Sequence, residues 1–173
     1  MIMTNGHLTR VSSKLRERAK EIGIPDLIFG FAVGVIILYG ALIIHELFHV
    51  FFAWLFGYPA GIGALLMFEG WTVVAKEIVN PQAKAIIALA GPLGSFFVGM
   101  YFWKQGKHSI ERYLALVLWL ISTAPNLLPL ADGRDATYII QGFGYPFAWF
   151  IFLVTFGYMW AKLLEEGIGP LRW

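Results

Sequence analysis

Two histidines and a glutamate lie together in the string HELFH, residues 45–49, within an otherwise apolar stretch. Residues 27–44 before it contain no charged side chain, and ionisable groups this deep in an apolar span are costly and usually functional. On a helix, His45 and His49 occupy positions i and i+4 on one face, so both imidazoles can reach one metal ion. Glu46 then lies beside the metal, where its carboxylate can activate a bound water.

The alternative is a pair of helix histidines that only form hydrogen bonds inside a bundle. A single histidine favours that interpretation, whereas the pair with Glu46 between its members favours metal binding. Zinc is the expected ion, because imidazole and carboxylate ligands suit it and hydrolysis needs no redox chemistry. The chain has no cysteine, so thiolate ligands and disulfides are excluded.

A catalytic zinc takes three protein ligands and leaves one position open, so a third ligand must come from elsewhere in the chain. Asp132 is the favoured residue, because it closes an apolar helix, follows Pro129 and precedes Gly133, which permits a sharp turn. The competing interpretation is an ordinary aspartate at a helix end or turn. The other acidic residues lie mostly in polar segments, where a solvated charge is the default: Asp26, Glu69, Glu77, Glu111, Asp135, Glu165 and Glu166.

Asn126 is the second polar residue of interest in this part of the chain. It precedes Asp132 by about one and a half helical turns and lies in an apolar span. A buried amide needs hydrogen-bond partners, so Asn126 either donates to a substrate carbonyl or bonds a neighbouring helix. Ser95 and Thr123 are interpreted as packing hydroxyls.

The composition indicates an integral membrane protein. Of the 173 residues, 58% are hydrophobic and only 14% are charged, and the mean hydropathy is +0.68. A soluble domain of this size needs far more polar surface. The length suits one helical bundle, and the formal net charge of +2 is too small to indicate a nucleic-acid partner.

The predicted fold class is an all-α polytopic membrane protein with a small β-hairpin. Residues 1–25 are basic, with apolar residues at three- and four-residue spacing, which is typical of an interfacial helix. Residues 26–173 are expected to form one membrane domain, with its core at residues 27–135. Four spans are expected, at about 27–56, 80–103, 110–128 and 145–164.

The segments between these spans carry their own signals. Two β-prone runs, 62–68 and 71–75, predict a hairpin joined by a turn at Glu69-Gly70. Asn80 and Pro81 are expected to be the cap and the first residue of the second span. Residues 134–144 have mixed polarity and are expected to form a connector.

Three motifs, in this order along the chain, resemble the site-2 proteases, a family of intramembrane zinc metalloproteases with a three-helix catalytic core. The motifs are HELFH, then AGPLGSF at residues 90–96, then NLLPLADG at residues 126–133. The resemblance implies that His45, His49 and Asp132 are the zinc ligands.

The same resemblance assigns roles to other residues. It implies that Glu46 is the catalytic base, that Asn126 lies near the oxyanion and that the hairpin at 62–75 offers an edge strand to the substrate. Two features differ from the family pattern. The stretch from Asn126 to Asp132 is two residues shorter, and Ser95 stands where the family often has asparagine.

The expected function is hydrolysis of a peptide bond in or near a transmembrane segment of a membrane protein or membrane peptide. The protein is expected to be a multi-pass protein in the lipid bilayer of the cell membrane. Gly30 and Gly34 form a pair that permits close helix packing, and a homodimer stays open as an alternative to a monomer.

Two other functions compete with proteolysis. The first is a catalytically inactive, metal-binding membrane regulator of the same fold, against which the intact Glu46 argues. The second is a divalent-metal transporter. A transporter needs ionisable residues in several spans, and the second and fourth expected spans have none at mid-depth.

Overall fold

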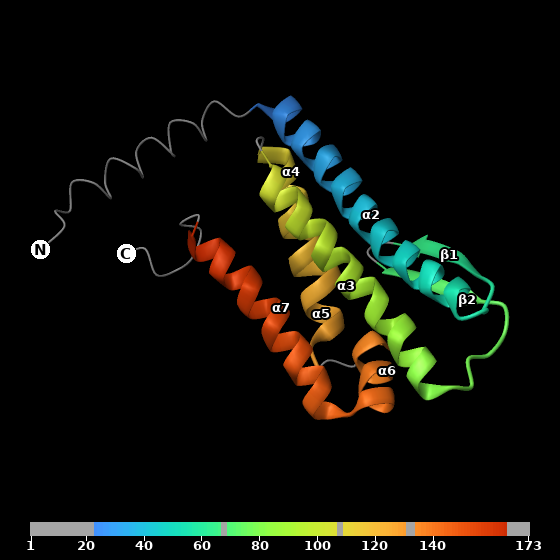
Figure 1. Ribbon diagram of the computed structural model, residues 1–173. Coiled ribbons are helices and arrows are strands. Elements are labelled where there is room, and N and C mark those ends of the chain that lie inside the picture. Colours follow the sequence, from blue (N-terminus) through green and yellow to red (C-terminus); the bar gives the residue numbers. More distant parts are fainter. Residues whose placement is uncertain (1–22, 67–68, 107–108, 131–133, 166–173) are drawn as a thin grey trace, which may run out of the picture. The chain divides into compact units, whose positions relative to one another are not determined.

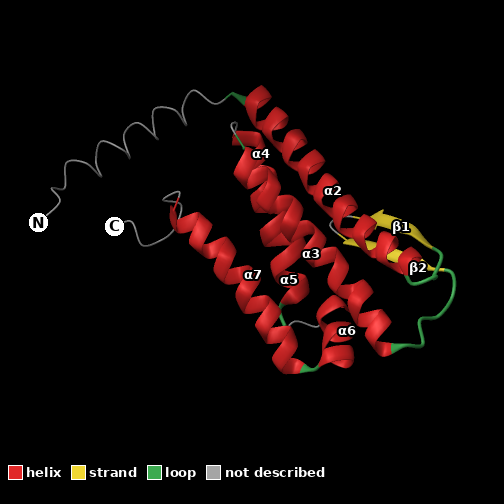
Figure 2. Ribbon diagram, viewed as in Figure 1, coloured by secondary structure: helices red, strands yellow, loops and turns green. Residues whose placement is uncertain are grey.

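The computed structural model describes residues 23–66, 69–106, 109–130 and 134–165. The chain divides into two compact units, residues 1–36 and 37–173. Helix α2 (Ile24–Leu55) runs through the boundary between them. Figure 1 labels the elements and Figure 2 colours them by type. After α2 come β1 (Ala60–Leu66), β2 (Glu69–Val74), α3 (Pro81–Gln105), α4 (Ser109–Val117), the π-helix η1 (Leu118–Thr123), α5 (Ala124–Leu127), α6 (Arg134–Phe143) and α7 (Tyr145–Glu165).

Three of the described helices, α2, α3 and α7, are long and apolar enough to cross a membrane. They correspond to the first, second and fourth expected spans. The expected third span is helical too, but it consists of α4, η1 and α5 in direct succession, each shorter than a bilayer-spanning helix. The fold is therefore mostly helical with a small hairpin, as predicted, and the expected third span at about 110–128 stays a prediction.

Helix α3 supplies buried side chains to two of the three hydrophobic groups described in the second unit. Its start is capped as predicted: Asn80 Oδ1 accepts hydrogen bonds from the backbone N–H groups of Gln82 and Ala83, and Pro81 opens the helix. One group joins α3 to α4, η1 and α7, and the other joins it to α5, α6 and α7. The first contains Phe96, Trp103, Ala115, Trp119, Met159 and Leu163, and the second contains Ala88, Leu127, Ile139 and Ala148.

The π-helix η1 is attached to the backbone of α3 by two side chains. Trp119 Nε1 donates to the carbonyl oxygen of Phe96 at 3.1 Å, and Thr123 Oγ1 donates to that of Pro92 at 3.2 Å. Because Trp119 and Thr123 are four residues apart, they share one face of their helix. Two hydrogen bonds between helices therefore align the predicted third span with α3.

Residues 134–143 form a helix, α6, where the sequence led us to expect a connector. Ala136 and Ile139 are buried one turn apart, which is the amphipathic pattern of a surface helix. Polar residues around them obscure that pattern in so short a segment. Lys84 Nζ of α3 lies 4.0 Å from the centre of the Tyr138 ring, so a cation–π contact adds to the apolar packing between α3 and α6.

Strands β1 and β2 pair antiparallel, as the predicted hairpin requires, but the turn is displaced. Leu66 pairs with Glu69, so the connection consists of residues 67–68, which lie outside the described part of the chain. The predicted turn at Glu69-Gly70 is wrong, because both residues belong to β2. The pairing begins at Ala60 with Val74, and this register carries Leu65 and Leu66 opposite Gly70 and Glu69, so the turn comes before Glu69. A register shift after Ile62 gives β1 one more residue than β2 opposes, which is a β-bulge.

Helix α6 approaches the start of α3 closely at Gly142, where a Cβ would overlap the Cβ of Ala85 and lie 2.9 Å from Pro81 O. We expect Gly142→Ala to lower the free energy of unfolding by about 1–3 kcal/mol, because the overlap forces the helices apart. Thermal denaturation of the purified protein in detergent measures this. Gly157→Ala in α7 is the matched control, since no atom lies within 4 Å of its added Cβ. Equal melting temperatures for the two variants would contradict the docking of α6 described above.

Candidate metal centre

The two histidines of HELFH lie on one buried face of α2, as their spacing predicts. The side chains of His45 and His49 are almost completely buried. Their rings meet edge to face, with centroids 4.7 Å apart, and the two Nε2 atoms are 3.0 Å apart. Both imidazoles thus direct the same nitrogen toward one point.

Asp135, the second residue of α6, completes a group of three metal-ligating side chains. Its Oδ2 lies 3.1 Å from His45 Nε2 and 3.4 Å from His49 Nε2. The carboxylate is 90 residues away from His45 in the sequence and is brought in by the packing of α6 on α3. In the part of the chain that the structure describes, His45, His49 and Asp135 form a group that could hold a metal ion.

The separations within this group fit a tetrahedral metal site. Ligand atoms of a zinc ion lie about 2.0–2.1 Å from the metal, which places them about 3.3 Å from one another. The three observed separations are 3.0, 3.1 and 3.4 Å. Two imidazoles and one carboxylate also leave a fourth position for water or substrate, as a catalytic site requires.

Neighbouring groups fix the orientation of both rings. His49 Nδ1 lies 2.6 Å from Ile87 O, and because a carbonyl oxygen only accepts, Nδ1 must carry the proton. A neutral His49 therefore presents a lone pair at Nε2 to the shared point. His45 Nδ1 lies 3.5 Å from the buried Ser95 Oγ. Partners of this kind orient ligating histidines and set their tautomers, so the interpretation of Ser95 as a packing hydroxyl is incomplete.

The Asp135 carboxylate is the anionic member of the group. Burial by itself raises the pKa of a carboxyl group. Here the contacts with His45 and His49, which donate hydrogen bonds and carry positive charge when their Nε2 atoms are protonated, outweigh that effect and lower the pKa of Asp135 to about 2. The side chain is therefore ionised at neutral pH and can act as a ligand without first losing a proton.

Gly91 of α3 lies directly against both histidines. A Cβ at this position would overlap Nε2 and Cε1 of His49 and lie 2.8 Å from His45 Nε2. Three residues further along α3, a Cβ at Gly94 would overlap the ring of Phe48. The glycines of the AGPLGSF motif thus allow α3 to reach the HELFH face of α2.

Glu46 is buried on α2 but is not a member of the three-residue group. Its carboxylate contacts the hairpin instead, where Thr72 Oγ1 of β2 donates to Glu46 Oε2 at 2.8 Å. A carboxylate next to the ligands but outside the group is the arrangement that a general base requires.

The predicted site residues therefore have different outcomes. His45 and His49 lie together on one face of α2, as their spacing predicts. Glu46 is buried on the same helix, and its predicted role as the catalytic base stays a prediction. Asp132 lies outside the described residues, so its predicted role as a ligand stays a prediction. Asn126 lies on α5, where its Nδ2 donates to Ser122 O of the preceding turn at 3.0 Å, and its predicted role near the oxyanion also stays a prediction.

The sequence does not favour Asp135 as a ligand, because it lies in a segment of mixed polarity. The signal that could have identified it is the amphipathic spacing of Ala136 and Ile139, which makes the segment a packed helix. An aspartate in the first turn of a helix that packs on the bundle lies near buried groups and is less free to face solvent.

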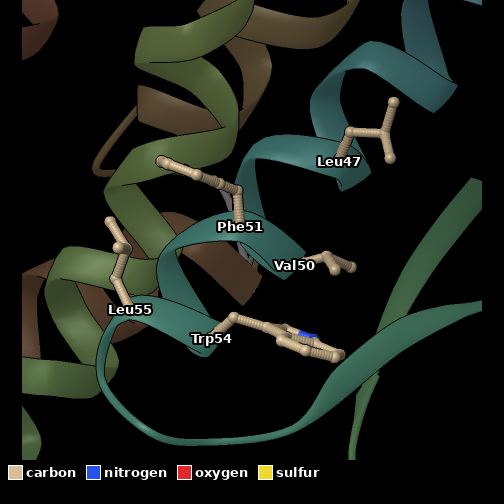
Figure 3. A pocket seen from close by; sticks show the side chains of 5 residues that line it. All are labelled: Leu47, Val50, Phe51, Trp54 and Leu55. Atoms are coloured by element: carbon tan, nitrogen blue, oxygen red, sulfur yellow. The ribbon is translucent and has the colours of Figure 1, made fainter.

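Another face of α2 carries large, exposed apolar side chains beside the hairpin. Figure 3 shows a shallow groove lined by Leu47, Val50, Phe51, Trp54 and Leu55. Trp54 Nε1 donates to Ala60 O at 2.8 Å, which ties this face to the start of β1. The helix thus presents its histidines to the bundle and an apolar surface to its surroundings.

Comparisons of the chain with protein-family models, with curated proteins and with solved structures find no match.

Gly91→Ala should weaken metal binding while the protein remains folded. The added methyl group must displace the imidazoles that the site aligns, and changes to groups that orient ligands typically cost about 10- to 100-fold in metal affinity. Competition with a zinc chelator measures the affinity. Gly40→Ala, on the same helix as the histidines and with open space around its Cβ, is the matched control. Wild-type affinity in Gly91→Ala would show that the histidines do not form the site.

Asp135→Ala should remove most of the bound metal, since two histidines alone leave the site one ligand short. Elemental analysis of purified Asp135→Ala, Asp132→Ala and His45→Ala compares the two candidate carboxylates with a histidine ligand. Loss in Asp135→Ala but not in Asp132→Ala would assign the third ligand to Asp135. Full metal content in Asp135→Ala would exclude it from the site.

Proposed function

We propose that this chain is an intramembrane zinc metalloprotease that hydrolyses a peptide bond in or near a transmembrane segment of a membrane-protein substrate. The observation that carries the proposal is the convergence of two imidazole nitrogens and a carboxylate oxygen, with Glu46 adjacent on the same helix. The order of the three sequence motifs, which resembles that of the site-2 proteases, supports the same activity.

Three long apolar helices support a location of this chemistry within a membrane. In addition to α2, α3 and α7, we propose that α4, η1 and α5 together make a fourth span, since helical backbone continues from Ser109 to Leu127. The protein is then a multi-pass protein of the cell membrane. A substrate that is itself a membrane segment can reach such a site without leaving the bilayer.

The residues divide the hydrolysis among them. His45, His49 and Asp135 would hold zinc, which supplies Lewis acidity to polarise the scissile carbonyl and make water a stronger acid. Glu46 accepts the proton of the attacking water as the water oxygen bonds to the carbonyl carbon. It then delivers that proton to the leaving nitrogen as the C–N bond breaks.

The hairpin and the apolar groove offer a binding surface for such a substrate. A helical substrate hides its carbonyl groups, so it must unwind before it can be cleaved. Within the described residues β1 and β2 pair only with each other, so a hairpin edge can accept an extended segment by main-chain hydrogen bonds. The groove on α2 next to the hairpin suits the apolar remainder of a membrane segment.

The second candidate is an inactive metal-binding regulator with the same fold. It shares the three ligands, so metal content cannot separate it from a protease. What favours the protease is the buried Glu46 carboxylate with a hydrogen-bond donor beside it, because a regulator has no use for a buried base.

Glu46→Gln should retain zinc and fold but lose cleavage, by about 100-fold or more, because an amide cannot take the proton from water. A library of membrane peptides, presented to the purified protein in liposomes, measures turnover. Glu77→Gln, an exposed carboxylate in the segment before α3, is the matched control and should cleave like the wild type. Equal turnover by wild type and Glu46→Gln would refute the mechanism, and no cleavage by the wild type would favour the regulator.

A further inference from the structure

The hairpin contacts the centre of the site through one side chain. Thr72 lies on β2, opposite Ile62 of β1 and immediately before the β-bulge. Its Oγ1 lies 2.8 Å from Glu46 Oε2 and 3.4 Å from Glu46 O, and the two residues are 26 positions apart in the sequence. The hydroxyl therefore bonds to the carboxylate of α2 while its backbone belongs to the hairpin.

We infer that Thr72 is a positioning residue for Glu46, an inference that rests on the proposed function. A glutamate side chain has three rotatable bonds, and a buried carboxylate needs a donor to replace water. The Thr72 hydroxyl holds Oε2 and leaves Oε1 to take the proton of the attacking water. A hydrogen bond to a charged group is among the stronger ones, so it selects one rotamer.

This assignment gives the hairpin a second task. Its backbone edge binds the substrate, and Thr72 on the same hairpin holds the base. The hairpin therefore positions both Glu46 and the scissile bond. The distance between the Glu46 carboxylate and the substrate then depends on this one element. A loss of the hydroxyl should lower the rate of chemistry and leave substrate binding intact.

Steady-state cleavage by Thr72→Val and Thr72→Ser tests the role. Valine has nearly the shape of threonine without its hydroxyl, whereas serine keeps the hydroxyl. We expect Thr72→Val to retain zinc and KM and to lose about tenfold in kcat, which corresponds to about 1.4 kcal/mol of transition-state stabilisation. Thr72→Ser should restore most of the rate. Thr155→Val is the control, since among the described residues the hydroxyl of Thr155 bonds to carbonyls of its own helix, α7.

Three results bear on the inference differently. Raised KM with unchanged kcat in Thr72→Val would overturn it, because the residue would then only shape the substrate surface. Unchanged kcat and KM in Thr72→Val, beside an inactive Glu46→Gln, would overturn this inference alone. Equal activity of Glu46→Gln and wild type would instead overturn the proposed function.

Hydrogen exchange of the hairpin amides tests the contact without any cleavage assay. If the hydroxyl links β2 to Glu46, the backbone amides of β1 and β2 should exchange faster in Thr72→Val than in Thr72→Ser. In a Glu46→Ala background the difference between the two variants should shrink, since the carboxylate is gone and only the longer contact with the backbone carbonyl of residue 46 remains. Equal exchange of Thr72→Val and Thr72→Ser in the presence of Glu46 would overturn the inference, whether or not the protein is a protease.

Discussion

The close approach of three helices at glycine is the constraint on which the site depends. Helix α3 meets the imidazoles of α2 at Gly91, and α6 meets α3 at Gly142, with no room for a side chain at either contact. A Cβ at either glycine would push the helices apart and so lengthen the distances between the ligating atoms of His45, His49 and Asp135. The metal-ligating atoms therefore converge because backbone, and not side chain, fills the space between the helices.

Burial of polar groups in an apolar bundle is costly, and the described part of this chain compensates that cost throughout. No buried side-chain nitrogen or oxygen among the described residues lacks a hydrogen-bond partner. Backbone carbonyls of α3 accept from His49 and from Thr123, so one helix stabilises both the candidate site and the packing of η1. A network with all members satisfied is rigid, and rigidity is what a site with fixed ligand spacing requires.

The candidate site is assembled from elements with different kinds of support. Helix α2 supplies two candidate ligands and the proposed base from little more than one turn, so the spacing of their backbone positions depends on helix geometry. The third candidate ligand and the hydrogen-bond partner of Glu46 come from α6 and β2, whose positions depend on packing. A damaged contact of α6 should thus affect metal binding, whereas a damaged contact of β2 should affect the base.

The local periodicity of the sequence by itself determined several features. The shared face of His45 and His49 follows from their spacing, because a helix repeats every 3.6 residues whatever surrounds it. The cap at Asn80 and the existence of a hairpin follow in the same way from short-range signals. The membrane class follows from the apolar composition of α2, α3 and α7.

Only the tertiary structure decided which distant groups meet these residues. Asp135 contacts the histidines across 90 residues and Thr72 contacts Glu46 across 26, and neither pairing leaves a pattern in the intervening sequence. The sequence of α6 predicts a connector because its apolar stripe is short. That stripe is recognisable as a buried helix face only once α6 packs on α3. The position of the hairpin turn is likewise decided by the register in which β1 and β2 pair. Such contacts depend on which surfaces fit together in three dimensions, and periodicity along one chain does not contain that information.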